Sequence, residues 1–120
     1  MRPALLLTLL LAGTPAAAQP YSQSLAQCGA LYALMSDWVD NPDRSTRLAH
    51  ASVVFAQAAT LRAGAEGVAD PAVAIQAQAA EKRAEWVQNG KLWIFTEEFR
   101  DWTRYCRAFA RDRGLDIDPD

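Results

Sequence analysis

The clearest helical pattern in this 120-residue chain is in residues 22–39, SQSLAQCGALYALMSDWV. Its apolar residues recur every three or four positions, a spacing that gathers them on one face of a helix. These residues are Leu25, Cys28, Leu31, Tyr32, Met35, Trp38 and Val39. Asn41-Pro42 ends the segment, because a proline disfavours helical geometry at the residue before it. The same pair predicts a second helix that begins at Pro42 with Asn41 as its cap.

The second helix is predicted over residues 42–63, with Gly64 as its terminator. Its apolar face is predicted to be Leu48, Ala51, Val54, Phe55, Ala58 and Leu61. Asp70-Pro71 then repeats the cap-and-proline signal, and Asn89-Gly90 ends the third helix that this signal begins. The expected apolar face of the third helix is Val73, Ala77, Ala80, Ala84 and Val87. Both helices are rich in alanine, so we expect them to pack closely and to bury little area per residue.

A fourth helix is predicted between Thr96 and Gly114. Thr96 can cap its N-terminus, and Glu97 and Glu98 place negative charge in the first turn, where the helix dipole favours it. Its apolar face is predicted to be Phe99, Trp102, Tyr105, Cys106 and Phe109. The acidic tail, residues 116–120, is expected to fray.

Cys28 and Cys106 are the only cysteines, so an internal disulfide can form only between them. A metal pair and two free thiols are the alternatives, but structural zinc needs four good ligands and the chain has one histidine. Four helices with short links favour an up-down-up-down arrangement, which brings the two cysteines together. An orthogonal four-helix array would satisfy the pairing too. We therefore predict an all-α fold, a small four-helix bundle with one disulfide linking its first and last helices.

The first eighteen residues are predicted to be a cleavable signal peptide. Arg2 precedes a short apolar run in residues 4–12, and the small residues Ala16-Ala17-Ala18 follow it, a pattern typical of export signals. The run is too short to span a bilayer, and the sequence predicts no transmembrane segment after it. A single helical domain over residues 19–120 is then expected in the periplasm or outside the cell, where its cysteines can oxidise.

Charge narrows the possible functions. Cleavage after Ala18 removes Arg2 from the twelve basic residues and leaves eleven against fourteen acidic ones, a net charge of −3. Such a mild balance argues against a general binder of nucleic acid or of anionic membranes. We therefore expect no nucleic-acid partner.

No catalytic or metal-binding residues are predicted. No serine stands on a strand-turn-helix elbow, and the residue three positions before the single histidine, His50, is Arg47 rather than the glutamate of carboxylate metal sites. Met35 and His50 lie at matched heights in the first helical hairpin and could ligate haem in a bundle core. The chain has no CxxCH attachment motif, and bulky aromatic residues compete for the space. No cofactor is predicted.

The predicted fourth helix carries a ridge of arginines at spacings of four, three and four, which places them on one face. They are Arg100, Arg104, Arg107 and Arg111. Because arginine makes bidentate contacts, this arginine ridge could dock an acidic protein, a phosphate-bearing ligand or lipid headgroups. The favoured interpretation is a solvated face whose charges are relieved by the nearby Glu97, Asp101 and Asp112.

Leu92-Trp93-Ile94-Phe95 is a fully apolar tetrad between the third and fourth helices. Periodicity does not distinguish a buried connector from a short strand or an early helical turn. An apolar run of this kind is more often packed in the core than exposed. If Trp93 or Phe95 projects outward instead, the tetrad is an interaction patch or the lip of a pocket.

These features predict an interaction or accessory module of the cell envelope: an inhibitor, an immunity factor, a chaperone-like protein or a complex subunit. Its partner is expected to be another protein there. The candidate contact residues are Arg100, Arg104, Arg107, Arg111, Trp93 and Phe95. The alternative is a bundle that binds haem or a hydrophobic ligand in its core. An enzyme whose site is not visible in the sequence is the third hypothesis.

Overall fold

The structure of the protein, a computed structural model, describes residues 19–118. These residues form four α-helices, one 3-10 helix and no strand. The helices are α1 (Tyr21–Trp38), α2 (Pro42–Ala65), α3 (Pro71–Val87) and α4 (Glu97–Asp112), and the 3-10 helix η1 (Lys91–Phe95) precedes α4. The predicted signal peptide, residues 1–18, lies outside the described residues.

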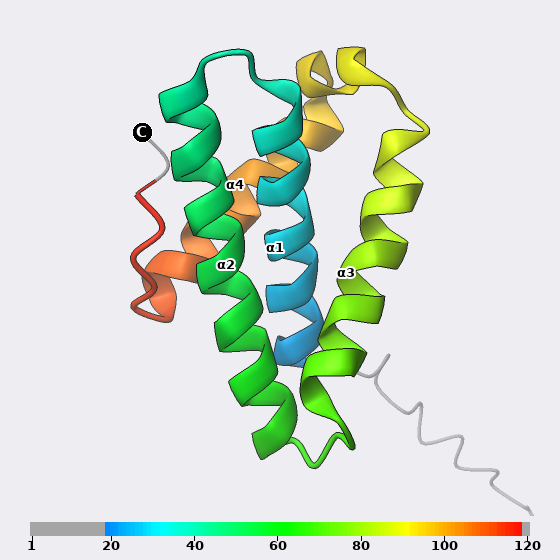
Figure 1. Ribbon diagram of the computed structural model, residues 1–120, viewed down its shortest axis with the longest axis vertical. Coiled ribbons are helices and arrows are strands. Elements are labelled where there is room, and N and C mark those ends of the chain that lie inside the picture. The colour runs from blue at the N-terminus through cyan, green and yellow to red at the C-terminus, as the bar shows by residue number, and fades with distance from the viewer. Residues whose placement is uncertain (1–18, 119–120) are drawn as a thin grey trace, which may run out of the picture.

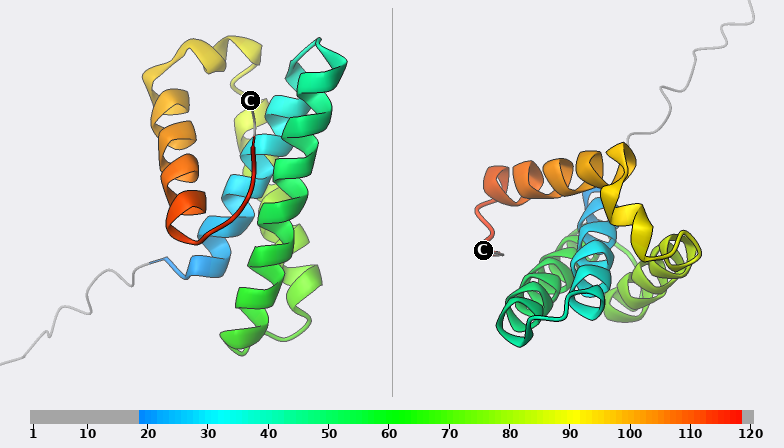
Figure 2. Two further views of the ribbon diagram at one scale, coloured as in Figure 1. Left: turned by 90° about the vertical axis from the view of Figure 1, so that its left-hand side faces the viewer. Right: turned by 90° about the horizontal axis from the view of Figure 1, so that it is seen from above.

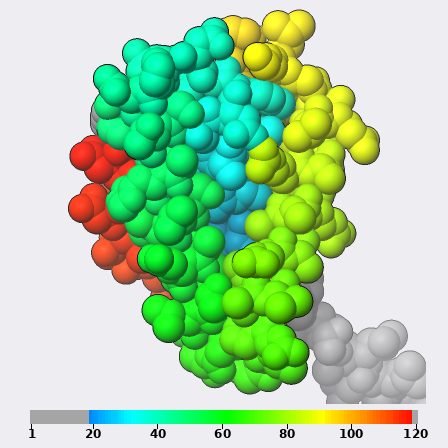
Figure 3. Space-filling view, in the orientation of Figure 1, coloured from blue at the N-terminus to red at the C-terminus, as the bar shows by residue number. Residues whose placement is uncertain are grey.

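Successive helices run in alternating directions, and α1 is the central helix (Figure 1). α2 and α3 flank α1, while α4 crosses behind it obliquely, as the view from above also shows (Figure 2). On the opposite face, α1 is visible between α2 and α3 (Figure 3). The predicted four-helix fold is confirmed, with α4 tilted against the other three helices.

The sequence of α1 suits a helix that has neighbours on several sides. Its buried residues lie around much of its circumference and include the small Ala26 and Ala30 as well as Leu31. At Gly29, a β-carbon would lie 3.3 Å from the backbone oxygen of Ser52 on α2. The Ser52 hydroxyl donates a hydrogen bond to the carbonyl oxygen of Gly29 over 2.9 Å. Small residues therefore allow α2 to approach α1 closely at this point.

The predicted apolar face of α3 is wrong. All five residues of that face, Val73, Ala77, Ala80, Ala84 and Val87, are exposed. Ile75 and Trp86 are the buried residues of α3, at 2% and 1% exposure. They are eleven positions apart, about three helical turns, so they share a face. Burial scales with apolar area, so these two large side chains decide which face turns inward, and five small or medium residues do not.

One residue of the predicted α2 face is also misplaced. Leu61 is 78% exposed, whereas Ala59 and Ala63 are buried. The helix continues past Gly64 to Ala65. Gly67, in a left-handed conformation at φ 82°, is its true terminator, and the amide of Val68 donates to the carbonyl of Ala63 over 3.0 Å.

Two of the three predicted caps are confirmed. The side chain of Asn41 accepts a hydrogen bond from the amide of Arg44 over 2.9 Å, and that of Thr96 accepts one from Phe99 over 3.2 Å. α3 begins at Pro71 as predicted, but Asp70 adopts a left-handed conformation at φ 47° and its side chain makes no capping hydrogen bond. Pro71 alone therefore accounts for the start of α3.

The C-terminal tail does not fray where the structure describes it. Ile117 is only 7% exposed and belongs to the hydrophobic core. α4 ends at Asp112, Gly114 follows in a left-handed conformation at φ 66°, and the amide of Leu115 donates back to the carbonyl of Ala110 over 2.9 Å. This reversal returns the chain to the core, where an apolar side chain at position 117 can be buried.

Candidate functional site

The apolar tetrad at residues 92–95 is folded as η1, between α3 and α4. Gly90, at φ 76°, supplies the left-handed turn that η1 needs after α3. The carbonyl of Gly90 then accepts a hydrogen bond from the amide of Trp93 over 3.0 Å. A 3-10 helix has three residues per turn, so residues three apart lie directly above one another.

Trp93 faces inward and holds η1 to the core. It is 4% exposed, stacks on Trp86 with ring centroids 5.4 Å apart, and meets Phe99 edge-on at 5.3 Å. Its indole N–H donates to Oε2 of Glu98 over 3.2 Å, and its carbonyl accepts a hydrogen bond from the Thr96 hydroxyl over 2.6 Å. Trp93 is therefore not available as a contact residue, which corrects its place among the candidates.

Leu92 and Phe95 lie on either side of Trp93 in the sequence and face outward. Their exposed fractions are 77% and 72%. Because they are three residues apart on a 3-10 helix, they form one continuous apolar surface, here called the apical patch. The tetrad is thus divided: Trp93 belongs to the core, Ile94 is partly buried, and the apical patch is open to solvent.

Trp86 is a buried neighbour of η1 that the helical pattern of α3 did not assign to the core. It contacts Trp93 of η1 and also Trp102 of α4, whose ring centroid is 5.0 Å away in an edge-on geometry. The ammonium of Lys82 lies 5.2 Å from the Trp86 ring and 5.2 Å from the Trp102 ring. This cluster packs α3, η1 and α4 against one another next to the apical patch. The sequence could have indicated this burial through the size of Trp86, because a tryptophan on a helix otherwise rich in alanine is the side chain with most area to bury.

All four residues of the arginine ridge are exposed along α4. Arg104 pairs with Asp101 over 3.7 Å, and both side chains are largely exposed, at 79% and 63%. Between residues 19 and 118, Arg100, Arg107 and Arg111 make no ion pair. An exposed pair of this kind contributes little to stability, so the ridge keeps most of its positive charge toward solvent.

Met35 and His50 are not brought together in the core. Met35 is partly buried against the core, and His50 is exposed on α2. An axial pair for haem would need both side chains to face the same interior space. Within the described residues, no group of three or more histidine, cysteine, aspartate or glutamate side chains is arranged to hold a metal ion.

Several cavities open at the surface of the described residues. One of about 590 Å³, between the start of α1 and the start of α4, is lined by Gln19, Ser24, Gln27, Glu97, Glu98, Asp101, Trp102 and Tyr105. Another of about 340 Å³ lies between the arginine ridge and the C-terminal tail and is lined by Arg107, Ala110, Arg111, Leu115, Asp116, Ile117 and Asp118. A third cavity, of about 360 Å³, has a mostly apolar lining from α1 and α2 and is bordered by Arg62 and Arg113.

Glu66, just after α2, accepts hydrogen bonds from the start of α1. The Ser22 hydroxyl donates to its Oε1, and the Ser22 amide donates to its Oε2 over 3.4 Å. Nε of Arg62 also contacts Oε2, at 3.2 Å. These donors, the Ser22 hydroxyl first among them, hold the pKa of Glu66 below its usual value because they stabilise the ionised carboxylate.

The fold defines a small, disulfide-linked protein of four helices. Comparison with protein-family models, with curated proteins and with solved structures found no match to this chain. None of the helices between residues 19 and 118 has the length and apolar character needed to cross a bilayer.

Proposed function

We propose that this protein is an interaction module of the cell envelope that binds a partner protein through the apical patch. The observation that carries the proposal is the outward orientation of Leu92 and Phe95 around the buried Trp93. Exposed large apolar side chains that adjoin one another are typical of contact surfaces, whereas single ones are common everywhere.

The packing of η1 against the core supports this function. Binding orders the side chains of an interface at an entropic cost, and a preorganised surface lowers that cost. η1 is held by the stacked Trp86 and Trp93 rings and by the hydrogen bond from the Trp93 indole to Glu98. Phe95 can therefore serve as an aromatic anchor of the kind that carries much of the energy of an interface.

The charges beside the patch indicate the partner's chemistry. Glu97 follows Phe95 by two residues, is exposed, and makes no ion pair with any residue between 19 and 118. Lys91, directly before Leu92, is also exposed and makes no ion pair with any residue between 19 and 118. A complementary partner has an apolar pocket for Phe95, a basic group facing Glu97 and an acidic group facing Lys91. The arginine ridge, farther along α4, is a second contact surface in this proposal and faces acidic groups of the same partner.

The cell envelope is supported by the disulfide between Cys28 and Cys106, since disulfides persist in oxidising compartments. The export pattern in residues 1–18 supports the same location. Both features together favour a partner in the periplasm or outside the cell.

Site-specific photo-crosslinking in the native host tests the proposal. A benzophenone amino acid in place of Phe95 is expected to give a discrete crosslinked product, identified by mass spectrometry. The matched control places the same group at Val53, which is 51% exposed on α2. Absence of a product at position 95, or the same products at both positions, would show that the apical patch is not the contact surface.

A further inference from the structure

A groove far from the apical patch is formed by the start of α1, the second half of α2 and the chain just after α4. These segments lie in the half of the molecule away from η1 (Figures 1 and 2). The groove has a volume of about 360 Å³ and is here called the Tyr21 groove. It is lined by Tyr21, Leu25, Ala58, Leu61, Arg62, Ala65, Arg113 and Leu115.

Most of this lining is apolar. Leu25, at 5% exposure, lies at the bottom of the groove, and Leu61, at 78%, forms an open lip. Leu115 contributes from the segment that folds back after α4, and Ala58 and Ala65 contribute small side chains from α2. Leu61 is the residue that the helical pattern of α2 assigned to the core. Its exposure leaves an apolar surface that no described residue covers.

Two guanidinium groups border the groove at Tyr21. The Cζ atom of Arg113 lies 3.8 Å from the centre of the Tyr21 ring, and that of Arg62 lies 5.1 Å from it. The two arginines differ in their partners. Arg62 is paired with Glu66 over 3.2 Å, whereas Arg113 makes no ion pair with any of residues 19–118.

The groove therefore has one guanidinium without an acidic partner among the described residues. It belongs to Arg113 and stacks on the ring of Tyr21. A planar guanidinium binds a carboxylate through two parallel hydrogen bonds, and stacking leaves its N–H edge free for them. A monoanionic head matches one free guanidinium. A dianionic phosphate would need a second guanidinium, and the guanidinium of Arg62 is already paired with Glu66.

We propose that the Tyr21 groove binds a single-chain fatty acid, with its carboxylate on Arg113 and its alkyl chain along Leu25, Leu61 and Leu115. Each part of the ligand has a counterpart in the groove: the monoanionic head on the free guanidinium, and the chain on the apolar lining. A cavity of this size is in the range of small-molecule sites. The proposal goes beyond the protein interaction proposed above and does not depend on it, because the apical patch contributes no residue to the groove.

The test is titration of the protein with laurate below its micelle concentration, followed by calorimetry and by NMR of the Arg113 side chain and the leucine methyl groups. Saturable binding at one site is expected. Dodecyltrimethylammonium, with the same chain and the opposite charge, is expected to bind at least about tenfold more weakly, as the loss of a charge-assisted contact predicts. Equal binding of the two amphiphiles, or no binding of laurate, would overturn the proposal.

Two pairs of variants locate the site. Arg113→Gln is expected to weaken laurate binding about tenfold, whereas Arg104→Gln, at a 79% exposed position on α4 outside the groove, leaves it unchanged. Leu61→Gln is expected to weaken it at least about threefold through lost apolar contact, and Val53→Gln on the same helix leaves it unchanged. Equal effects of Arg113→Gln and Arg104→Gln on laurate binding would mean that laurate is attracted by positive charge in general, and would overturn the proposed site.

Two further probes distinguish other occupants of the groove. Vesicles of phosphatidylglycerol test a membrane surface, and an apolar peptide with a free C-terminal carboxylate tests a protein terminus. If either binds through Arg113 and monomeric laurate does not, the fatty-acid proposal is wrong. Laurate binding that depends on both Arg113 and Leu61, with unchanged circular dichroism of the variants, supports it.

Discussion

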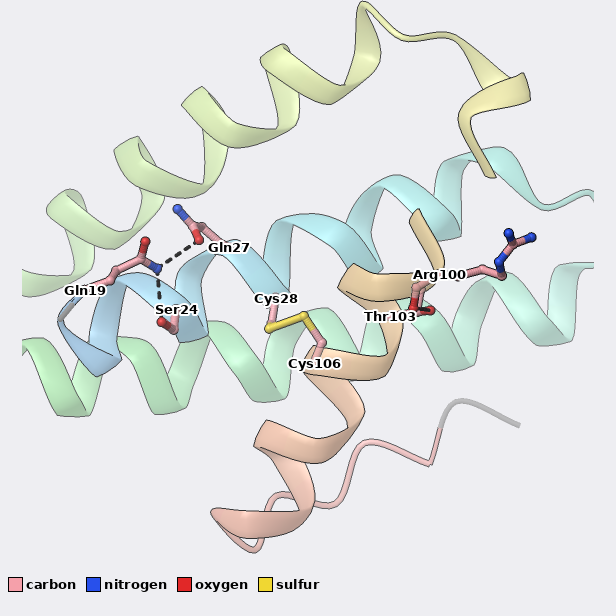
Figure 4. The surroundings of a disulfide bond; sticks show 7 residues. All are labelled: Gln19, Ser24, Gln27, Cys28, Arg100, Thr103 and Cys106. Carbon is pink, nitrogen blue, oxygen red and sulfur yellow. Dashed lines mark hydrogen bonds between the residues drawn. A yellow bond between two sulfur atoms is a disulfide. The ribbon is translucent and has the colours of Figure 1, made fainter. Parts of the chain in front are cut away.

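Cys28 and Cys106 are 78 residues apart in sequence, and their disulfide joins α1 to α4 with the two Cα atoms 5.5 Å apart (Figure 4). Both residues are completely buried. Because α4 crosses α1 obliquely, the two helices are adjacent over a short length only, and the disulfide lies within it. It therefore links the helix of the arginine ridge to the centre of the fold.

The first prediction concerns removal of this disulfide. Cys28→Ala with Cys106→Ala is expected to lower the free energy of unfolding by about 2–5 kcal/mol, because the unfolded chain regains the freedom of a long loop. Urea denaturation followed by circular dichroism measures the change. The wild type should also be two mass units heavier after reduction, and reduction should lower its denaturation midpoint but leave that of the double variant unchanged. Equal midpoints for all forms would contradict the prediction.

The second prediction tests the observed face of α3. Ile75→Ala is expected to cost about 2–5 kcal/mol of unfolding free energy, because it leaves a cavity in the core. Val73→Ala, two residues earlier and 67% exposed, is expected to stay within about 0.5 kcal/mol of the wild type. Chemical denaturation measures both. A larger loss of stability for Val73→Ala than for Ile75→Ala would mean that the face predicted from the sequence is the buried one.

This helix shows where sequence reasoning succeeds and fails for the fold. The approximate positions of α2, α3 and α4 followed from proline, glycine and capping residues, because these act through local backbone geometry, although α2 continues past Gly64 and Asp70 makes no capping hydrogen bond. The large residues predicted for the face of α1 are buried or partly buried, but burial extends around much of the helix and includes small residues outside that face. On α3, Val73 and Val87 belong to a regular pattern that competes with the pair Ile75 and Trp86, and tertiary packing decides between the two.

The candidate site was predictable only in part. An apolar tetrad is visible in the sequence, but which of its side chains is buried depends on whether Trp86 offers a stacking partner to Trp93. The Tyr21 groove was not predictable, because its lining comes from three segments distant in the chain and includes Leu61, which the pattern of α2 places in the core. Contacts between distant segments are the information that helical periodicity lacks.

The third prediction uses two glycines in helices. At Gly29 a β-carbon would lie 3.3 Å from the oxygen of Ser52 and 3.4 Å from Cβ of Phe55, so Gly29→Val is expected to destabilise by about 1–3 kcal/mol through overpacking. At Gly64 the nearest atom is Cγ of Pro71 at 3.9 Å, so Gly64→Ala is expected to stabilise by about 0.4–1 kcal/mol through reduced freedom of the unfolded chain. Thermal and urea unfolding measure both. A neutral or stabilising effect of Gly29→Val would contradict the close approach of α1 and α2, and a destabilising effect of Gly64→Ala would contradict the open space at Gly64.

The fourth prediction concerns acid. Hydrogen bonding, chiefly from the Ser22 hydroxyl, lowers the pKa of Glu66 in the folded protein, so this carboxylate favours folding above the pKa it has in the unfolded chain. The contribution is lost as pH falls through the lower, folded value. Ser22→Ala is therefore expected to destabilise more at pH 7 than at pH 3, with the difference shrinking below about pH 4.3, the ordinary pKa of glutamate. Denaturation midpoints across this pH range measure it, with Ser45→Ala as a control serine. A constant effect of Ser22→Ala at every pH would refute the linkage.

The fifth prediction separates the apical patch from the arginine ridge as the surface that carries partner affinity. With the partner identified by crosslinking at position 95, Phe95→Ala is expected to raise its Kd by about 30-fold, mainly through faster dissociation, as for an anchor residue worth about 2 kcal/mol. Reversing Arg104 and Arg107 to glutamate is expected to slow association and to reduce its salt dependence, because exposed charges act chiefly on the encounter.

The control for the fifth prediction reverses Arg44 and Arg47 to glutamate. These two residues are also exposed but lie on α2, so the net charge changes equally while the ridge stays intact. Surface plasmon resonance at two salt concentrations separates the rates. If the ridge reversal abolishes binding and Phe95→Ala leaves the Kd unchanged, α4 is the docking surface and the apical patch is not. If both reversals slow association equally, net charge rather than the ridge attracts the partner, because only the ridge variant changes the charge along α4.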